Sequence, residues 1–130
     1  MKKALILFLV LLFLGGIAFG TYYFVWTPEN FSAWGATAMK KGDYETAADR
    51  YQVAVDLEPA NINYVLALMN AHVADGNYTK AERTLVKAIR VAPSARLYCE
   101  LSALYVLQDK ILDAQLMLDT ITDPMVRSEI

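Results

Sequence analysis

Hydrophobic residues divide the chain into one long apolar run and a series of shorter segments with the spacing of amphipathic helices. The run extends from Ala4 to Trp26 without a charged residue. At helical rise it is about 34 Å long, enough to cross a hydrocarbon core of about 30 Å. Beyond it, apolar residues recur three and four positions apart, which is typical of helices with one buried face. We predict these helices over residues 28–41, 44–57, 62–75, 78–91, 95–108 and 111–122.

Glycine and proline residues mark the ends of the predicted helices. Gly42 and Gly76 follow two of them directly, where a left-handed backbone conformation ends a helix. Pro59 and Pro93 come just after two others and block their continuation. Thr27 is a typical N-terminal cap for the helix that begins at the next residue. These signals predict helices arranged in pairs, with a short turn inside each pair.

The region after residue 26 repeats itself at a shift of 34 residues. The turn Gly42-Asp43-Tyr44 recurs as Gly76-Asn77-Tyr78. The same shift preserves small residues and prolines: Ala47 with Ala81, Ala54 with Ala88, and Pro59 with Pro93. A fixed period of this length is the signature of a helical repeat array. We expect the small residues to let helices approach closely, and bulky ones to fill the space beside them: Trp34, Tyr44, Tyr51, Leu68, Tyr78 and Leu85.

The repeated residues resemble the tetratricopeptide repeat pattern. The first copy reads Phe31-x2-Trp34-Gly35-x2-Ala38, then Gly42-Asp43-Tyr44, then Ala47-x3-Tyr51-x2-Ala54-x4-Pro59. The second copy reads Val65-x2-Leu68-Met69-x2-His72, then Gly76-Asn77-Tyr78, then Ala81-x3-Leu85-x2-Ala88-x4-Pro93. A third copy runs from Tyr98-x2-Leu101-Ser102-x2-Tyr105 to Pro124 at a shift of 33, and it lacks the turn glycine.

Together, the apolar run and the resemblance imply an all-α chain. We expect a transmembrane helix followed by an α-α superhelix of about three helix-turn-helix repeats. Residues 1–26 form the N-terminus and the membrane anchor in this interpretation, and residues 27–124 form the array. The three repeats cover about 28–61, 62–94 and 95–124. Residues 125–130 are expected to begin a capping helix or a further C-terminal region.

The charges that flank the apolar run predict its orientation. Lys2 and Lys3 precede the run, and the next basic residue is Lys40. The positive-inside rule therefore keeps the N-terminus in the cytoplasm and exports the array. The run is either a signal peptide cleaved at Ala18-Phe19-Gly20 or an uncleaved anchor. We favour the anchor because apolar residues continue beyond that site. The layout is similar to that of bacterial cell-surface proteins, so we expect a single-pass protein of a bacterial plasma membrane.

Composition and charge exclude several classes of function. The 130 residues are 56% hydrophobic and carry a net charge of −2, so the chain lacks the basic face of a nucleic-acid-binding protein. The single cysteine, Cys99, and the single histidine, His72, exclude an internal disulfide and a zinc cluster. We expect a free thiol at Cys99, a helix-packing role for His72 and a solvated acidic surface that includes Asp49. We predict no enzymatic activity, no metal or cofactor, and no small-molecule substrate.

In the family that the pattern resembles, the first helix of each repeat lines a concave groove that receives a peptide. Registration of this chain on that pattern predicts a lining of Met39, Lys40, Asn63, Leu66, Asn70, Val73, Arg96 and Val106. The amide and guanidinium groups would bond a peptide backbone or carboxylate, and the apolar side chains would contact apolar residues of the peptide. We expect a protein or peptide partner and a role in protein interaction or complex assembly at the membrane. The alternative is a structural stalk or spacer that presents a further C-terminal domain.

Overall fold

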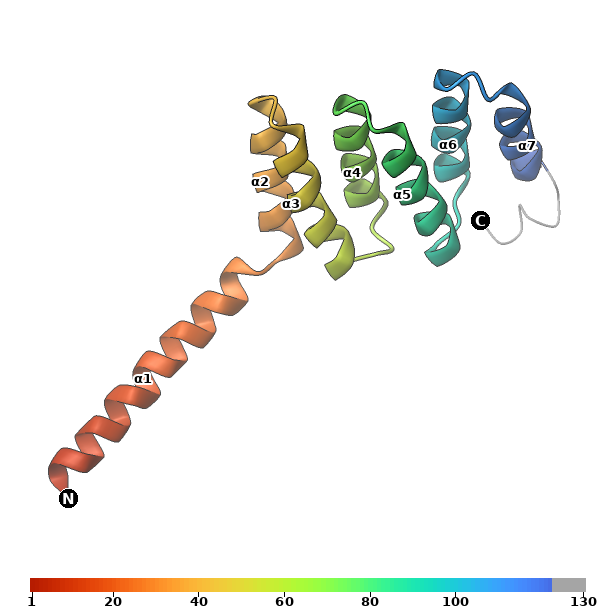
Figure 1. The fold of residues 1–130 in the computed structure, drawn as a ribbon. Helices are drawn as coiled ribbons and strands as arrows, with labels where there is room; N and C mark the ends of the chain where they lie inside the picture. Colours follow the sequence, from red (N-terminus) through yellow and green to blue (C-terminus); the bar gives the residue numbers. More distant parts are fainter. Residues whose placement is uncertain (123–130) are drawn as a thin grey trace.

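A computed structural model of the chain describes residues 1–122 and contains seven α-helices and no β-strand in that range (Figure 1). The helices are α1 (Lys2–Val25), α2 (Pro28–Lys40), α3 (Tyr44–Leu57), α4 (Ile62–Ala74), α5 (Tyr78–Val91), α6 (Ala95–Leu107) and α7 (Ile111–Thr122). The predicted repeat helices are confirmed to within one residue at each end. The helix expected to begin at residue 125 lies outside the described residues.

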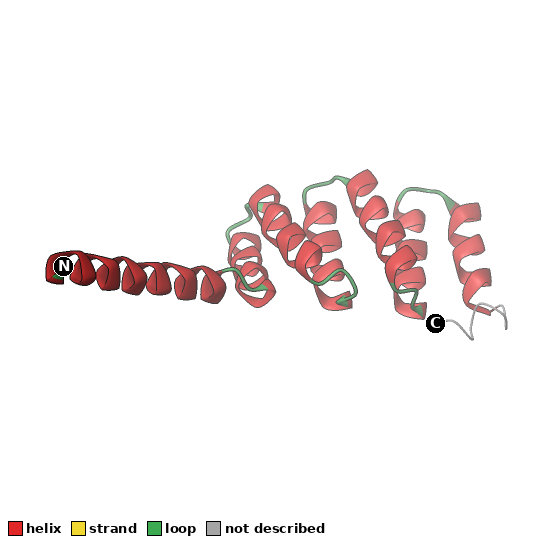
Figure 2. Cartoon of the chain, turned by 90° about the horizontal axis from the view of Figure 1, so that it is seen from below, coloured by secondary structure: helices red, strands yellow, loops and turns green. Residues whose placement is uncertain are grey.

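After α1, the helices form three antiparallel pairs, α2 with α3, α4 with α5, and α6 with α7. Each helix also packs on the next one along the chain. In Figure 1, α2, α4 and α6 stand in one row, and α3 and α5 lie in front of them. Figure 2 shows the same succession from below, with α1 leaving the array at its α2 end. The fold is therefore an all-α array of helix pairs preceded by a single apolar helix.

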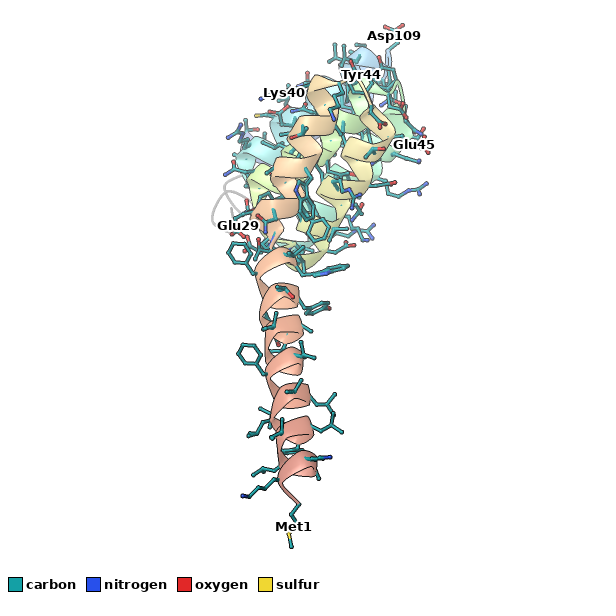
Figure 3. The ribbon with its side chains drawn as sticks, turned by 90° about the vertical axis from the view of Figure 1, so that its left-hand side faces the viewer. Met1, Glu29, Lys40, Tyr44, Glu45 and Asp109 are labelled. Carbon is teal, nitrogen blue, oxygen red and sulfur yellow. The ribbon has the colours of Figure 1, made fainter. Side chains whose placement is uncertain are left out.

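Left-handed residues form the turn inside each pair. Gly42 and Gly76 both have φ of 75°, as predicted, and Asp109 takes their place in the third pair with φ of 58°. After two of these turns, the side chains of Asp43 and Asn77 cap the following helix by accepting a hydrogen bond from its backbone. All three turns lie at the end of the array away from Met1, where Figure 3 labels Asp109.

Two hydrophobic clusters meet at α4 and form the core of the array. The larger cluster joins α4 to α5 and α6 through Val65, Leu66, Met69, Ala81, Leu85, Ala88, Leu97, Leu101 and Leu104. The smaller cluster joins α4 to α2 and α3 through Ala38, Ala47, Ala48, Tyr51, Leu68 and Ala71. No residue of α1 is buried. The hydrophobic core therefore lies entirely within the repeat helices.

Small residues allow close helix packing, but two of the predicted space-filling residues lie at the surface. Ala47 and Ala81 have no exposed area. Trp34 is 42% exposed, and the guanidinium of Arg50 lies 5.9 Å from the centre of its ring. Tyr78 is exposed as well. These two rings are therefore only partly enclosed by the helices, which the repeat period alone does not predict.

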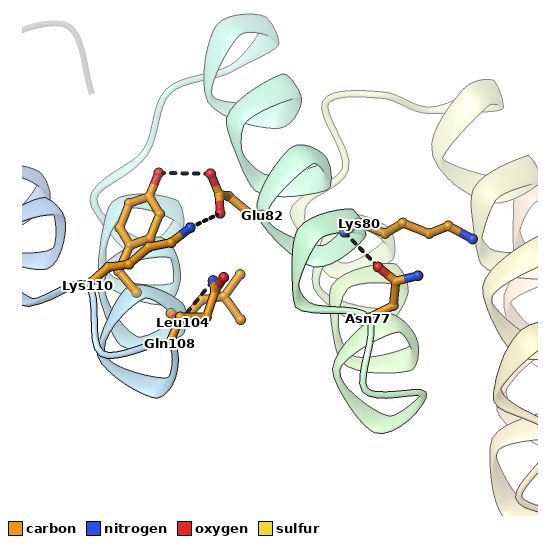
Figure 4. Close-up of polar contacts among 7 residues, drawn as sticks. Asn77, Lys80, Glu82, Leu104, Gln108 and Lys110 are labelled. Atoms are coloured by element: carbon orange, nitrogen blue, oxygen red, sulfur yellow. Dashed lines mark hydrogen bonds and ion pairs between the residues drawn. The ribbon is translucent and has the colours of Figure 1, made fainter.

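Repeats two and three are joined by a polar contact as well as by the larger core cluster. Glu82 on α5 accepts a hydrogen bond from the hydroxyl of Tyr105 at 3.4 Å and forms an ion pair with the ammonium of Lys110 at 3.0 Å (Figure 4). Burial raises the pKa of Tyr105, and the adjacent Glu82 carboxylate raises it further. In the same picture, Lys80 and Glu82 extend from opposite sides of α5. The acidic residue of α5 therefore faces the third repeat, and Lys80 is directed away from it.

The junction between α1 and α2 is short and closely bonded. Only Trp26 and Thr27 separate the two helices. The amide of Asn30 donates hydrogen bonds to the carbonyl oxygens of Phe24 at 2.9 Å and Val25 at 3.3 Å, and so satisfies the end of α1. The rings of Trp26 and Phe31 lie 5.3 Å apart. These contacts on both sides of the connection restrain the direction of α1 relative to the first repeat.

Candidate peptide-binding groove

All eight residues predicted to line a peptide groove lie on α2, α4 and α6. We call these three helices the inner row, because the first helix of each repeat is predicted to line the groove. The four polar members, Lys40, Asn63, Asn70 and Arg96, are exposed. Asn63 and Arg96 lie near the starts of α4 and α6, on the side of the array from which α1 leaves. Lys40 ends α2 at the opposite side, where Figure 3 labels it. The polar groups therefore extend over the full height of the inner row.

The apolar members differ in how accessible they are. Val106 is 51% exposed and available to a ligand. Met39 and Val73 are half-buried and pack against the two core clusters. Leu66 is only 7% exposed and belongs to the larger core cluster, so little of its side chain is open to a ligand. Its side chain packs with residues of α5 and α6, because the buried face of α4 extends as far as Leu66.

Several polar side chains on the inner row have no internal partner. Within residues 1–122, the side chains of Asn63, Asn70 and Arg96 form no hydrogen bond or ion pair. Asn63 and Arg96 occupy equivalent positions in the second and third repeats. Amide groups can donate to and accept from a peptide backbone, and a guanidinium can bind a carboxylate through two parallel hydrogen bonds. A ligand on these side chains would therefore displace none of the side-chain bonds that hold the described residues.

A concavity that sequence reasoning missed lies between α3 and α5, on the opposite side of the array from the predicted groove. It has a volume of about 450 Å³. Its apolar lining includes Val55, Val65, Leu68 and Ala88. We call this hollow, together with the exposed sides of α3 and α5 beside it, the outer face. The sequence predicts only a solvated acidic surface at Asp49 and does not single out the basic residues of this face.

The two walls of the outer hollow carry opposite charges. Asp49 and Asp56 line it from α3, and the basic residues Lys80, Arg83 and Lys87 line it from α5. No ion pair crosses the hollow in the part of the chain that the structure describes. The separation of charge by helix is visible in the sequence once the two repeats are aligned at the 34-residue shift. The sequence does not show how far apart α3 and α5 lie, and this separation keeps the two charged walls from forming ion pairs.

His72 lies at the floor of the same hollow and is half-buried. Burial lowers its pKa, and the positive charge of Lys80 lowers it further, while Asp75 and Asp49 oppose the shift. The expectation that His72 packs between helices is consistent with this position. Across residues 1–122, no group of three or more His, Cys, Asp or Glu side chains is arranged to hold a metal ion. Cys99 is a free, exposed thiol on α6.

A row of antiparallel helix pairs, each packed only on its neighbours, defines an α-helical repeat protein of the solenoid class. Its inner helices present a polar and apolar surface, and its outer helices a charged one. A family model described as Tetratricopeptide repeat matches residues 38–103, just over half of the chain. The chain belongs to the tetratricopeptide repeat family, whose members are typically non-enzymatic scaffolds for protein interaction. The resemblance noted in the sequence is confirmed at the level of the family.

Proposed function

We propose that this chain is a membrane-anchored scaffold that binds a peptide segment of a protein partner in its inner groove. The observation that carries the proposal is the set of exposed polar side chains without internal partners on the inner row, Asn63, Asn70 and Arg96. Exposed polar side chains contribute little to folding, and Asn63 and Arg96 occupy equivalent positions in two repeats, which supports a contact with an external partner. Val73 and Val106 supply apolar contacts near the ends of the same helices, α4 and α6, and Met39 does so near the end of α2.

The anchor in this proposal is α1. Among the described residues it is the only helix long and apolar enough to cross a membrane, and none of it is buried in the fold. Figure 3 shows its side chains projecting freely around the helix below the array. Lys2 and Lys3 at its start favour a cytoplasmic N-terminus and an exported array in a bacterial plasma membrane. A cleaved signal peptide is the competing explanation for the same helix.

Protease protection and mass measurement test the anchor and its orientation. Protease added to spheroplasts should remove the array, and the mature chain should retain the mass of residues 1–26. Complete protection of the array would place it in the cytoplasm. A mature chain that begins near Gly20 would show that the apolar helix is a signal peptide.

Capture of partners by the full chain tests the groove. The full chain in detergent is incubated with membrane extract, and the recovered protein is quantified for wild type, Asn63→Ala and Asn70→Ala. Each substitution should weaken binding by about 1–3 kcal/mol, because a peptide group that the amide satisfied is left unpaired in the interface. Gln115→Ala is the matched control, since Gln115 is an exposed amide on α7, outside the inner row.

The outcomes separate binding from the competing role as a spacer. Equal recovery of a partner by the wild type and by the Asn63→Ala and Asn70→Ala double variant would show that the inner groove is not the binding surface. Recovery of no partner by any variant would favour the stalk, in which the array only holds a further domain away from the membrane. Loss of binding by the control as well would indicate a general defect and not a groove contact.

A further inference from the structure

We infer that the outer face is a self-association surface, on which the acidic helix α3 of one chain lies against the basic helix α5 of a second copy. The inference does not depend on which peptide the inner groove binds. Its occupant is a second copy of this chain because the outer face carries both halves of a complementary pair.

The charges form two continuous stripes of opposite sign. On α3, the outward side carries Glu45, Asp49, Gln52 and Asp56, and on α5 it carries Lys80, Arg83, Lys87 and Arg90. Spacings of three and four residues place each set on one side of its helix. The single acidic residue of α5, Glu82, faces the third repeat, as described above. Each stripe is therefore nearly uniform in sign along the length of its helix.

The two stripes match in height because the repeats are related by 34 residues. Asp49 occupies the same position in its helix as Arg83, and Asp56 occupies the same position as Arg90. Within residues 1–122 none of these four side chains forms an ion pair, because the hollow keeps α3 and α5 apart. The complementary charges are thus in register but form no ion pair with each other, and Asp56 only accepts a hydrogen bond from the amide of Gln52 at 2.8 Å.

Helix stability explains only part of this arrangement, because Glu45 in the first turn of α3 and Arg90 in the last turn of α5 fit the helix dipole, but two other members of the stripes do not. Negative charge is unfavourable near the C-terminal end of a helix and positive charge near the N-terminal end. Asp56 lies in the last turn of α3, which has no basic residue, and Lys80 lies in the first turn of α5, which has no acidic residue. Both charges therefore occupy the end of the helix that disfavours them. A contact outside the chain would account for the signs of Asp56 and Lys80, which the helix dipole does not explain.

Consider a two-fold axis that lies over the hollow and runs parallel to α3 and α5. It brings the acidic stripe of each copy against the basic stripe of the other. Rotation about this axis places α3 of one copy over α5 of the other, and the reverse, as a closed symmetric interface requires. Height along the helices is unchanged, so Asp49 meets Arg83 and Asp56 meets Arg90 of the second copy. The same axis sends both α1 helices to the same side, which a single membrane requires if α1 is the proposed anchor.

Charge reversal in the full chain tests the inference. One variant carries Asp49→Arg and Asp56→Arg, and a second carries Arg83→Asp and Arg90→Asp. All four residues are exposed, so both variants should keep the helical content of the wild type. Self-association is measured in detergent over a dilution series by energy transfer between dyes on Cys99, which is exposed on α6 away from the outer face. The α1 sequence is unchanged, so any contribution of Gly16 and Gly20 to helix association is common to all samples.

The expected pattern is loss in each variant alone and recovery in combination. Each variant alone brings like charges together in the dimer, so its self-association should weaken by at least about 100-fold. A mixture of the two variants restores opposite charges at both contacts and should associate as the wild type does. A single chain that carries all four reversals should also recover, because its stripes are merely exchanged.

Two results would overturn the inference. A wild-type chain that stays monomeric at every concentration would show that no second copy occupies the outer face. Energy transfer that is equal in the wild type and in each reversed variant would show that association occurs elsewhere, with α1 the first place to examine. Because no step involves the inner groove, neither result bears on whether the groove binds a peptide.

Discussion

Adding one methyl group at Gly35 should destabilise the first repeat, although it removes a glycine from a helix. Gly35 is buried in α2 where that helix crosses α3. A Cβ atom at this position would lie 2.8 Å from both Cδ1 and Cε1 of Tyr51. Contacting carbon atoms prefer separations of about 3.5–4.0 Å. Tyr51 is itself buried in the smaller core cluster, so its ring cannot move aside into solvent.

Two opposing terms set the size of the effect. Replacing glycine by alanine inside a helix stabilises it by about 0.8–1.0 kcal/mol. Overpacking a close-packed core costs about 1–3 kcal/mol. We therefore expect Gly35→Ala to lower the free energy of unfolding by about 1 kcal/mol. Urea unfolding of a chain that starts at Thr27, followed by circular dichroism, should show this as a midpoint lower by about 0.3–1 M, for slopes of about 1–3 kcal/mol per M.

The second repeat provides the control. At the positions equivalent to Gly35 and Tyr51 it has Met69 and Leu85, so a larger residue on the first helix is matched by a smaller one on the second. The double variant Gly35→Ala and Tyr51→Leu should therefore be more stable than the sum of the two single changes by about 1 kcal/mol or more. A Gly35→Ala chain that is more stable than the wild type would refute the reasoning, because helix propensity alone would then decide the outcome.

Three further predictions concern the turn, the outer hollow and the array length. Asp109→Gly should raise the free energy of unfolding by about 0.5–1 kcal/mol, because Asp109 has positive φ; an unchanged urea midpoint would contradict this. Because the pKa of His72 is lowered in the fold, the unfolded chain binds the proton more readily, and stability present above about pH 6.5 is lost as the pH falls below it. His72→Gln should lessen this loss between pH 7.5 and 5.5 in urea titrations. Removing residues 95–130 should sharply lower the melting temperature, because about three repeats are needed to bury a continuous core; unchanged melting would show that the third repeat adds no packing.

The helices could be predicted closely because their ends are encoded locally. Gly42 and Gly76 end helices through their own backbone freedom, and Thr27, whose hydroxyl accepts the backbone N–H of Asn30, starts one. These signals act over a few residues and need no knowledge of the rest of the fold. The turn at Asp109 could not be predicted in this way, because a non-glycine residue takes the left-handed conformation there.

The candidate sites were less predictable because they depend on distances between helices. The helical period identifies the buried side of α4 but not its width, and Leu66 falls within that width because α4 contacts two core clusters at once. The outer hollow arises from the separation of α3 and α5, which belong to different repeats. No short-range pattern specifies that separation. The sequence contains one sign of the charged walls of the hollow: Asp49 and Arg83 have opposite charges at equivalent positions.

The short junction between α1 and α2 limits the reach of the array. With α1 in the bilayer, as proposed, the two connecting residues extend no more than about 10 Å, and the bonds from Asn30 to Phe24 and Val25 further restrict swinging. The array then explores a thin layer at the membrane surface instead of a wide volume. A partner that is itself confined to the same membrane meets it by two-dimensional diffusion, at a high local concentration. A soluble partner gains no such advantage, so the junction selects for neighbours in the membrane before any groove contact is made.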